Sequence, residues 1–187
     1  MAQCQAWEVL ARRLVLDREP WLRVFEEDVL LPSGTIIRNY IRKDSREYAM
    51  CFVRMQDGSV PMVQQYKHGI GQVSWDLPAG YLNGPHEEPL SAAQRELREE
   101  TGIVAPEWRA LAAPFIDTNR GMTRAHLFAA RGGALAYEPQ LDPTEDLEIS
   151  YHDPHELREM ARCGVIRSLP TVAAIMLAFD LIREGLL

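Results

Sequence analysis

Cysteine is scarce in this chain of 187 residues, and nothing in its placement indicates a disulfide framework or a zinc site. The three cysteines, Cys4, Cys51 and Cys163, are odd in number and far apart, and no C-x-x-C pair occurs. Disulfide-stapled domains and zinc knuckles need close, paired cysteines. A chain of this length buries about 70% of its unfolded surface without such staples. We therefore expect a protein of the reducing cytoplasm.

Long apolar runs are also missing. The longest run near the C-terminus covers residues 172–179, whereas a membrane-spanning helix needs roughly 20 apolar residues. The first apolar stretch contains Glu8, Arg12 and Arg13, and these charges are unlike the core of a signal peptide. The sequence therefore predicts no membrane association and no secretion.

Positive charge is sparse and acidic residues are clustered. The chain has a formal charge of −7 and no basic stripe, so duplex nucleic acid is not an expected partner. Residues 86–102 carry five acidic and two basic residues, and residues 135–160 carry eight acidic and one basic residue. These two segments account for −10, which leaves +3 for the rest of the chain. Such patches indicate either cation binding or two solvated faces.

The pattern of turns and apolar residues predicts an α/β (α+β) fold with a mixed sheet. Two strands separated by Pro32-Ser33-Gly34 form an N-terminal hairpin, and the charged stretch 42–47 is interpreted as a linker. We therefore expect a β extension over residues 1–46 and a main domain over residues 47–187. The expected strands are 22–30, 35–41, 50–55, 60–66, 73–80, 125–130 and 148–151, and the expected helices are 89–100, 154–162 and 171–184.

The helix predicted over 89–100 gathers carboxylates on one face. At about 100° per residue, Glu96, Glu99 and Glu100 fall within one arc, and the adjoining arc is apolar. Like charges at this spacing repel each other. A helix selected only for stability would place lysine among them, whereas a hard divalent cation would relieve the repulsion. An isolated acidic helix face is more often simply solvated, so the surrounding residues decide between the two interpretations.

The segment from Gly80 to Ile103 resembles the box of the Nudix hydrolase family, G-x5-E-x7-R-E-U-x-E-E-x-G-U, where U is aliphatic. The stretch from Glu87 onward matches throughout, while six residues instead of five separate Gly80 from Glu87. Residues 63–68 and 75–80 are similar to the ADP-ribose pyrophosphatase branch, and looser similarity covers nearly the whole chain. The resemblance implies a Nudix α/β/α sandwich with a mixed sheet.

The resemblance also implies a role for each residue of the box. Glu96 and Glu100 would be the principal ligands of Mg²⁺, with Mn²⁺ as a substitute, and the Ala79 carbonyl would be a third ligand. Glu99 would be a further ligand or would accept a hydrogen bond from a bound water. Arg95 would hold the glutamates, and Glu87 would be a supporting carboxylate or a ligand of an additional ion.

The general base in this branch commonly lies in a late acidic loop outside the box. Residues 142–148 occupy that place, and we select Glu145 as the base with Glu148 second, while a solvated loop stays the alternative. Lys67 stands where relatives often carry a phosphate-binding arginine, and a surface ion pair is its other interpretation.

Further substrate contacts are expected from Arg120 and Arg124, which could reach phosphate, and from Trp21 and Tyr40, which could stack a nucleobase. The loop carries Thr118-Asn119 where ADP-ribose hydrolases tend to have Pro-Gly. By the resemblance, the N-terminal extension would exchange with a partner to form a homodimer.

The leading hypothesis is Mg²⁺-dependent hydrolysis of a nucleoside diphosphate sugar, with ADP-ribose or another ADP-sugar favoured. The products would be a nucleoside monophosphate and a sugar phosphate. GDP-mannose or another nucleotide diphosphate is the alternative substrate. A non-catalytic nucleotide-binding Nudix module is the alternative of a different class, although such a module need not keep all three glutamates of the helix. A diphosphate isomerase is a weaker third.

Overall fold

The computed structural model describes residues 5–187, and their contacts divide them into two compact units. The first unit contains residues 5–46 and 115–124, and the second contains residues 47–114 and 125–187. The loop 115–124 joins the first unit through a backbone hydrogen bond of 2.7 Å from the Lys43 N–H to the Arg120 carbonyl. The boundaries expected from the sequence, 1–46 and 47–187, remain a prediction about domains.

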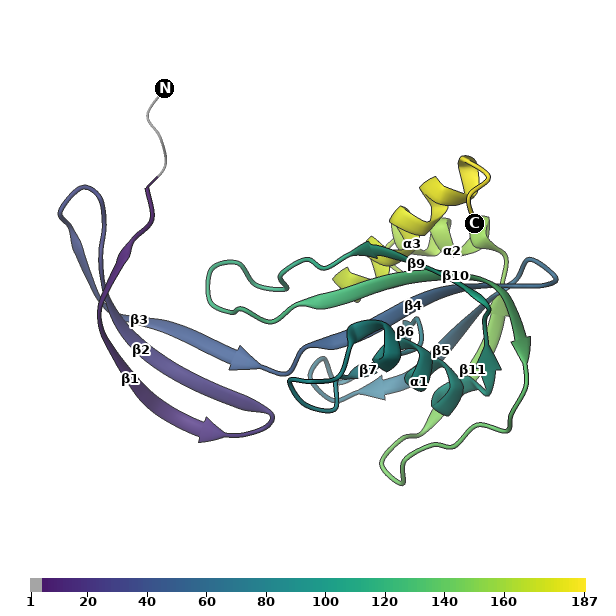
Figure 1. Ribbon diagram of the computed structural model, residues 1–187, viewed down its shortest axis with the longest axis horizontal. Coiled ribbons are helices and arrows are strands. Elements are labelled where there is room, and N and C mark those ends of the chain that lie inside the picture. The colour runs from purple at the N-terminus through teal and green to yellow at the C-terminus, as the bar shows by residue number, and fades with distance from the viewer. Residues whose placement is uncertain (1–4) are drawn as a thin grey trace. The chain divides into compact units, whose positions relative to one another are not determined.

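The first unit is built on an antiparallel sheet of three strands in the order β1-β2-β3 (Figure 1). Its strands are β1 (Glu8–Arg18), β2 (Leu22–Leu30) and β3 (Ile36–Ser45). The predicted hairpin is therefore present, but β1 adds a third strand that the sequence analysis missed. The prediction of a linker over 42–47 is wrong for residues 42–45, because β3 continues through them and pairs with β2 as far as Ser45.

The second unit contains a mixed sheet and an antiparallel sheet, as the predicted fold class requires. The mixed sheet has the order β7-β4-β10-β8, with β9 also paired to β10, and its strands β4 and β10 run parallel. The antiparallel sheet has the order β11-β5-β6. The strands are β4 (Tyr48–Met55), β5 (Val60–Lys67), β6 (Gln72–Asp76), β7 (Ala79–Tyr81), β8 (Ile103–Val104), β9 (Glu107–Ala112), β10 (Ala125–Leu135) and β11 (Leu147–His152).

Local sequence signals fix the ends of the helices, which are α1 (Pro89–Thr101), α2 (Pro154–Arg162) and α3 (Leu169–Arg183). Helix α1 begins with proline and ends at Gly102, whose φ of 70° is the left-handed conformation of a C-terminal cap. The Gly102 N–H donates to the Arg98 carbonyl at 2.8 Å. Asp153 and Ser168 cap α2 and α3 through their side chains. The three predicted helices thus agree with the structure to within about two residues.

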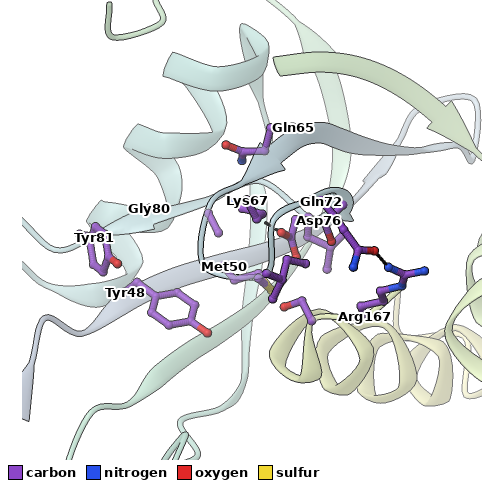
Figure 2. Close-up of a pocket in the computed structure, with 14 residues that line it drawn as sticks. Tyr48, Met50, Gln65, Lys67, Gln72, Asp76, Gly80, Tyr81 and Arg167 are labelled. Carbon is purple, nitrogen blue, oxygen red and sulfur yellow. Dashed lines mark hydrogen bonds and ion pairs between the residues drawn. The ribbon is translucent and has the colours of Figure 1, made fainter. Parts of the chain in front are cut away.

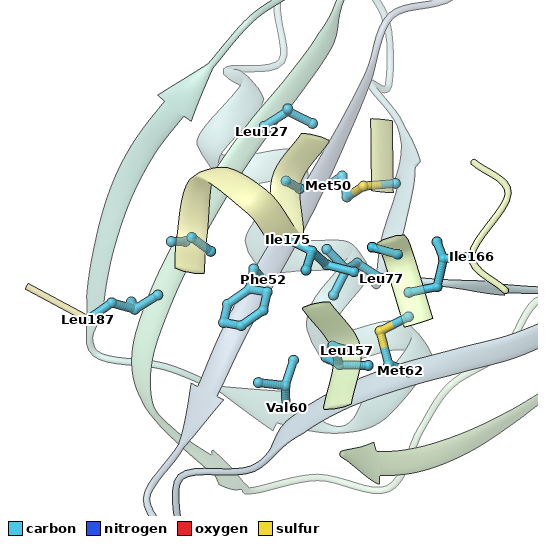
Figure 3. Close-up of a cluster of buried hydrophobic side chains, with 14 of the residues drawn as sticks. Met50, Phe52, Val60, Met62, Leu77, Leu127, Leu157, Ile166, Ile175 and Leu187 are labelled. Atoms are coloured by element: carbon cyan, nitrogen blue, oxygen red, sulfur yellow. The ribbon is translucent and has the colours of Figure 1, made fainter. Parts of the chain in front are cut away.

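Helices cover both faces of the mixed sheet, because successive side chains of a strand point to opposite faces. On β4, Ala49, Cys51 and Val53 pack with the apolar side of α1. The alternate residues Met50 and Phe52 join the larger cluster under α2 and α3, shown in Figure 3. Helix α1 and the pair α2 and α3 therefore lie on opposite sides of β4 and β10.

The described residues bear on two earlier expectations. No helix within residues 5–187 is long and apolar enough to cross a membrane. Cys51 is buried and Cys163 is exposed, and both are free thiols, whereas Cys4 lies outside the described residues.

Candidate active site

Arg95 is the centre of the acidic helix face. Its guanidinium donates to Glu96 at 2.6 Å and to Glu99 at 3.0 Å, both through Nη1. Its Nε donates to Glu87 at 3.0 Å, and its Nη2 donates to the Tyr81 carbonyl at 3.0 Å. One arginine therefore binds three carboxylates and the strand before the helix. Such charge-assisted contacts hold the side chains together, and the role of Arg95 in a reaction remains a prediction.

The strand β7 passes so close to α1 that a side chain at Gly80 would displace the Glu96 carboxylate. A Cβ atom built there would lie 2.1 Å from the Glu96 carboxyl carbon. On the neighbouring residue, the Ala79 N–H donates to the Glu100 carboxylate at 3.0 Å. The backbone of residues 79–80 thus borders the carboxylates of both Glu96 and Glu100, and glycine at position 80 leaves room for the Glu96 carboxylate in this position.

Glu96 and Glu100 are buried carboxylates at a place where negative charge is unfavourable. Burial raises the pKa of Glu100 to about 8, and the charges of Glu96 and Glu145 act in the same direction, against the Ala79 hydrogen bond and the charge of Lys67. Burial also raises the pKa of Glu96, although Arg95 opposes this shift. A bound cation would stabilise the ionised form of both groups.

The acidic loop between β10 and β11 is tied to the C-terminal end of α1. The Tyr137 N–H donates to the Gly102 carbonyl at 3.0 Å, and the Gln140 N–H donates to the Glu99 carbonyl at 2.8 Å. The loop brings Glu145 near enough for its charge to raise the pKa of Glu96 and Glu100. The Glu145 carboxylate also accepts the Asp142 N–H at 3.0 Å. The charge of Glu145 therefore acts on two carboxylates of the box.

Glu148, the second candidate base, is an exposed residue of β11. It lies opposite Gln64 of β5 in the antiparallel sheet. Glu145 belongs to the loop, and the choice between the two residues as the base remains a prediction.

A cavity of about 540 Å³ opens beside β7, and its wall includes Ala79 and Gly80, the residues whose backbone borders Glu96 and Glu100. Figure 2 shows side chains from several elements around it, with Lys67 and Asp76 joined by an ion pair. Lys67 and Arg167 are the cations that line it. The two cations of this lining can attract a polar, anionic molecule into the cavity.

Several residues of this cavity were not found from the sequence. Asp76, Gln72 and Arg167 come from β6 and from the segment before α3, and they meet only in the folded chain. Arg167 donates a hydrogen bond to the Gln72 side chain. None of these residues belongs to a short motif with a known spacing, although the stretch 75–80 was noted for its resemblance. Only the adjacency of β6 and the start of α3 could have revealed them.

Four predicted substrate-binding residues lie in the first unit, where each has partners of its own. Tyr40 donates a hydrogen bond to the Asn119 carbonyl, and the Arg120 N–H donates to Asp117 at 3.1 Å. Arg124 lies over the Phe115 ring at 4.3 Å. The Arg46 guanidinium lies over the Trp21 ring, with its Cζ atom 5.2 Å from the ring centroid. Their roles toward a substrate remain predictions.

A metal site has to be assessed from the donor atoms. Within residues 5–187, no group of three or more His, Cys, Asp or Glu side chains is arranged to hold a metal ion. Instead, Glu87, Glu96 and Glu99 are turned toward Arg95. The chemistry of the site nevertheless fits a hard cation, because such ions prefer oxygen ligands. The carboxylates of Glu96 and Glu100 are both buried, and both lie beside the backbone of residues 79–80. Arg95 contacts one oxygen of Glu96 and one oxygen of Glu99, so the second oxygen of each carboxylate would be the ligand of an ion.

Comparisons with known proteins agree with this geometry. The family model for the NUDIX domain matches residues 44–173. The chain is 39% identical over 154 residues to an ADP-ribose pyrophosphatase of Mycobacterium tuberculosis (strain ATCC 25618 / H37Rv), covering 80% of this chain and 72% of the relative. An ADP-ribose pyrophosphatase of Bacillus subtilis (strain 168) is 31% identical over 127 residues, covering 67% of this chain and 68% of the relative.

A structural comparison supports the same fold. The chain superposes on the crystal structure of an ADP compounds hydrolase with a TM-score of 0.86 and 19% identity, over the full length of both chains. The family match, the α/β/α layers and the carboxylate face of α1 agree with one another. The protein belongs to the Nudix family, and it is a Nudix hydrolase.

Proposed function

We propose that this hydrolase cleaves the diphosphate bond of a nucleoside diphosphate sugar in a Mg²⁺-dependent reaction. ADP-ribose or another ADP-sugar is the favoured substrate, and GDP-mannose or another nucleotide diphosphate is second. The observation that carries the proposal is a pair of buried carboxylates, Glu96 and Glu100, directly behind the wall of a cavity that also contains Lys67. Two relatives named ADP-ribose pyrophosphatase support the choice of substrate.

The metal ligands in this proposal are Glu96, Glu100 and the Ala79 carbonyl, with Glu99 and Glu87 as further candidates. Burial of Glu96 and Glu100 supports the assignment, because two adjacent buried carboxylates are stable in ionised form only with nearby positive charge. When bound, the ion would neutralise the diphosphate and lower the pKa of a water molecule. Mn²⁺ would substitute, since it accepts the same oxygen ligands.

The side chains of the protein would bind, orient and move a proton. Glu145 would accept a proton from the water whose oxygen attacks phosphorus. The bridging P–O bond then breaks, and the two phosphate monoesters leave as a nucleoside monophosphate and a sugar phosphate. Lys67 would hold the diphosphate by charge, while Arg95 keeps the carboxylates of α1 in place. Glu148 is the second candidate for the base.

Residues of the first unit are proposed to bind the substrate and to mediate a homodimer. Arg120 and Arg124 are proposed to bind phosphate, and Trp21 and Tyr40 are proposed to stack the nucleobase. The apolar residues of β1 support the dimer, because Val9, Leu10, Leu14 and Val15 are about half exposed. A cytoplasmic location remains an expectation from the cysteine content.

The experiment that tests this function is a substrate panel. The purified protein is incubated with Mg²⁺ and ADP-ribose, other nucleoside diphosphate sugars, dinucleotides or nucleoside triphosphates, and monophosphate release is measured. We expect the highest kcat/KM with an ADP-sugar. Preferential turnover of triphosphates would contradict the substrate assignment, and higher turnover of GDP-mannose would select the second substrate.

A further inference from the structure

A buried carboxylate lies at the cavity wall, between Lys67 and helix α3. Asp76 is the last residue of β6 and is 6% exposed. One of its oxygens accepts a hydrogen bond from the Thr171 hydroxyl at 2.5 Å. The other oxygen lies 3.5 Å from the Lys67 ammonium nitrogen. Figure 2 shows this ion pair at the cavity.

Asp76 is held more firmly than Lys67. Thr171 is completely buried in the first turn of α3, and its hydroxyl lies 2.9 Å from the hydroxyl of Ser168, the residue that caps the helix. Asp76 is therefore fixed to a rigid element. The Lys67 side chain is 40% exposed, and a flexible lysine loses much rotamer freedom when it is held in one place.

The position of the Lys67 ammonium group matters for any anion in the cavity. Lys67 lines the same cavity as Ala79 and Gly80, the backbone that borders the carboxylates of the box. Its charge also acts on Glu100, whose pKa it lowers against the effect of burial. The ammonium group thus lies at the cavity wall, within electrostatic range of Glu100.

We infer that Asp76 is a positioning residue, which holds the Lys67 ammonium group in the cavity so that it binds the diphosphate of the substrate. This inference rests on the function proposed above, and it assigns a role to a residue outside the Nudix box. Asp76 itself does not touch the substrate. It acts through Lys67. Asp76 is in turn held by Thr171, which lies in the first turn of α3.

Electrostatics and positioning predict opposite effects for the substitution Asp76→Asn. Removing a negative charge from the cavity wall makes the cavity more positive, which alone would strengthen the binding of a polyanion. Loss of positioning weakens binding, because the freed ammonium group must be ordered again by the ligand. We expect Asp76→Asn to weaken binding of inorganic diphosphate in the presence of Mg²⁺ by about fivefold to tenfold.

A double-mutant cycle with Lys67→Gln tests whether the effect passes through Lys67. If Asp76 acts by positioning, the double variant binds diphosphate about as weakly as Lys67→Gln alone, because the second change removes nothing further. Thr171→Val, which deletes the hydroxyl that fixes Asp76, should weaken binding in the same direction by about twofold to fivefold. The control is Asp180→Asn, a change of an exposed aspartate on the same helix.

The measurements are calorimetric affinity for inorganic diphosphate, kcat and KM for ADP-ribose, and thermal unfolding of each variant. The expected result is a higher Kd and KM with kcat changed by less than about twofold. Unchanged or tighter diphosphate binding by Asp76→Asn, or additive effects in the cycle, would overturn the inference, as would failure of the wild type to bind diphosphate. If Asp76→Asn does not fold, Thr171→Val decides by the same criterion. Failure of the proposed function is recognised separately, as diphosphate binding by the wild type without turnover of any nucleotide sugar.

Discussion

The buried carboxylate of Glu100 should make the metal-free protein less stable as the pH rises. Its pKa of about 8 in the folded protein lies above the ordinary glutamate value of 4.5, so folding favours the protonated form. A raised pKa contributes stability that is fully present below the unfolded pKa and is lost as pH rises through the folded pKa. The window is therefore pH 4.5 to 8. A pKa raised from 4.5 to about 8 corresponds to at most about 5 kcal/mol of stability.

The perturbation that isolates this effect is Glu100→Gln, which is uncharged at every pH. Urea unfolding is measured with a chelator at several pH values between 5 and 8.5 for the wild type, for Glu100→Gln and for Glu138→Gln, a control at an exposed glutamate. The wild type and the control should lose stability relative to Glu100→Gln as pH rises. Saturation with Mg²⁺ at 100 times its Kd should restore about 2.7 kcal/mol to the wild type at pH 8.

Two results would refute this reasoning. One is a difference in unfolding free energy between the wild type and Glu100→Gln that stays constant from pH 5 to pH 8.5. The other is a difference that changes in the opposite direction, with the wild type gaining relative stability as pH rises. Either result would mean that Glu100 has a partner in the metal-free protein that neutralises its charge.

Three further predictions concern the site and the core. Gly80→Ala should lower kcat/KM by at least about tenfold, because a Cβ would lie 2.1 Å from the Glu96 carboxyl carbon; steady-state kinetics check this, and Gly69→Ala, which meets no atom within 4 Å, is the control that should keep full activity. Glu145→Gln should lower kcat by at least about 100-fold with little change in Mg²⁺ affinity, and wild-type turnover would exclude it as the base. Phe52→Ala should cost about 3 to 5 kcal/mol in urea unfolding, because the ring is buried in the larger core cluster; a loss below 1 kcal/mol would contradict that packing.

Local signals made the helices predictable. Proline at the start of α1 and Gly102 at its end bound an apolar stripe, so the expected range of 89–100 falls one residue short of the observed end at Thr101. The spacing of Glu96, Glu99 and Glu100 follows directly from helix geometry. The carboxylate face could therefore be read from the sequence, and the structure adds the contacts with Arg95.

Strand β1 could not be predicted in the same way. Its residues include charged side chains, and its burial pattern is exposed at nearly every position, so neither clean alternation nor a continuous apolar run appears. Its pairing with β2 depends on register across a turn, with irregularities between Val9 and Ala11 and between Leu14 and Leu16. A strand whose side chains bury little surface against the rest of the chain shows only a weak hydrophobic pattern in its sequence.

The cavity was unpredictable for a different reason. Asp76 and Thr171 are 95 positions apart, and their contact depends on the packing of α3 beside β6. The pattern of either segment alone indicates only a strand end or a helix start. Short motifs fix residues within one element, whereas positioning contacts between elements follow from the tertiary fold.

The most direct test of the central claim is the hydrolysis of ADP-ribose by the wild type and by Glu100→Gln, with product analysis in the presence of Mg²⁺ and in the presence of a chelator. The account predicts that the wild type with Mg²⁺ releases AMP and ribose phosphate, that the chelator abolishes the activity, and that Glu100→Gln lowers kcat/KM by at least about 100-fold. Turnover that persists with the chelator, or that Glu100→Gln leaves unchanged, would contradict the account.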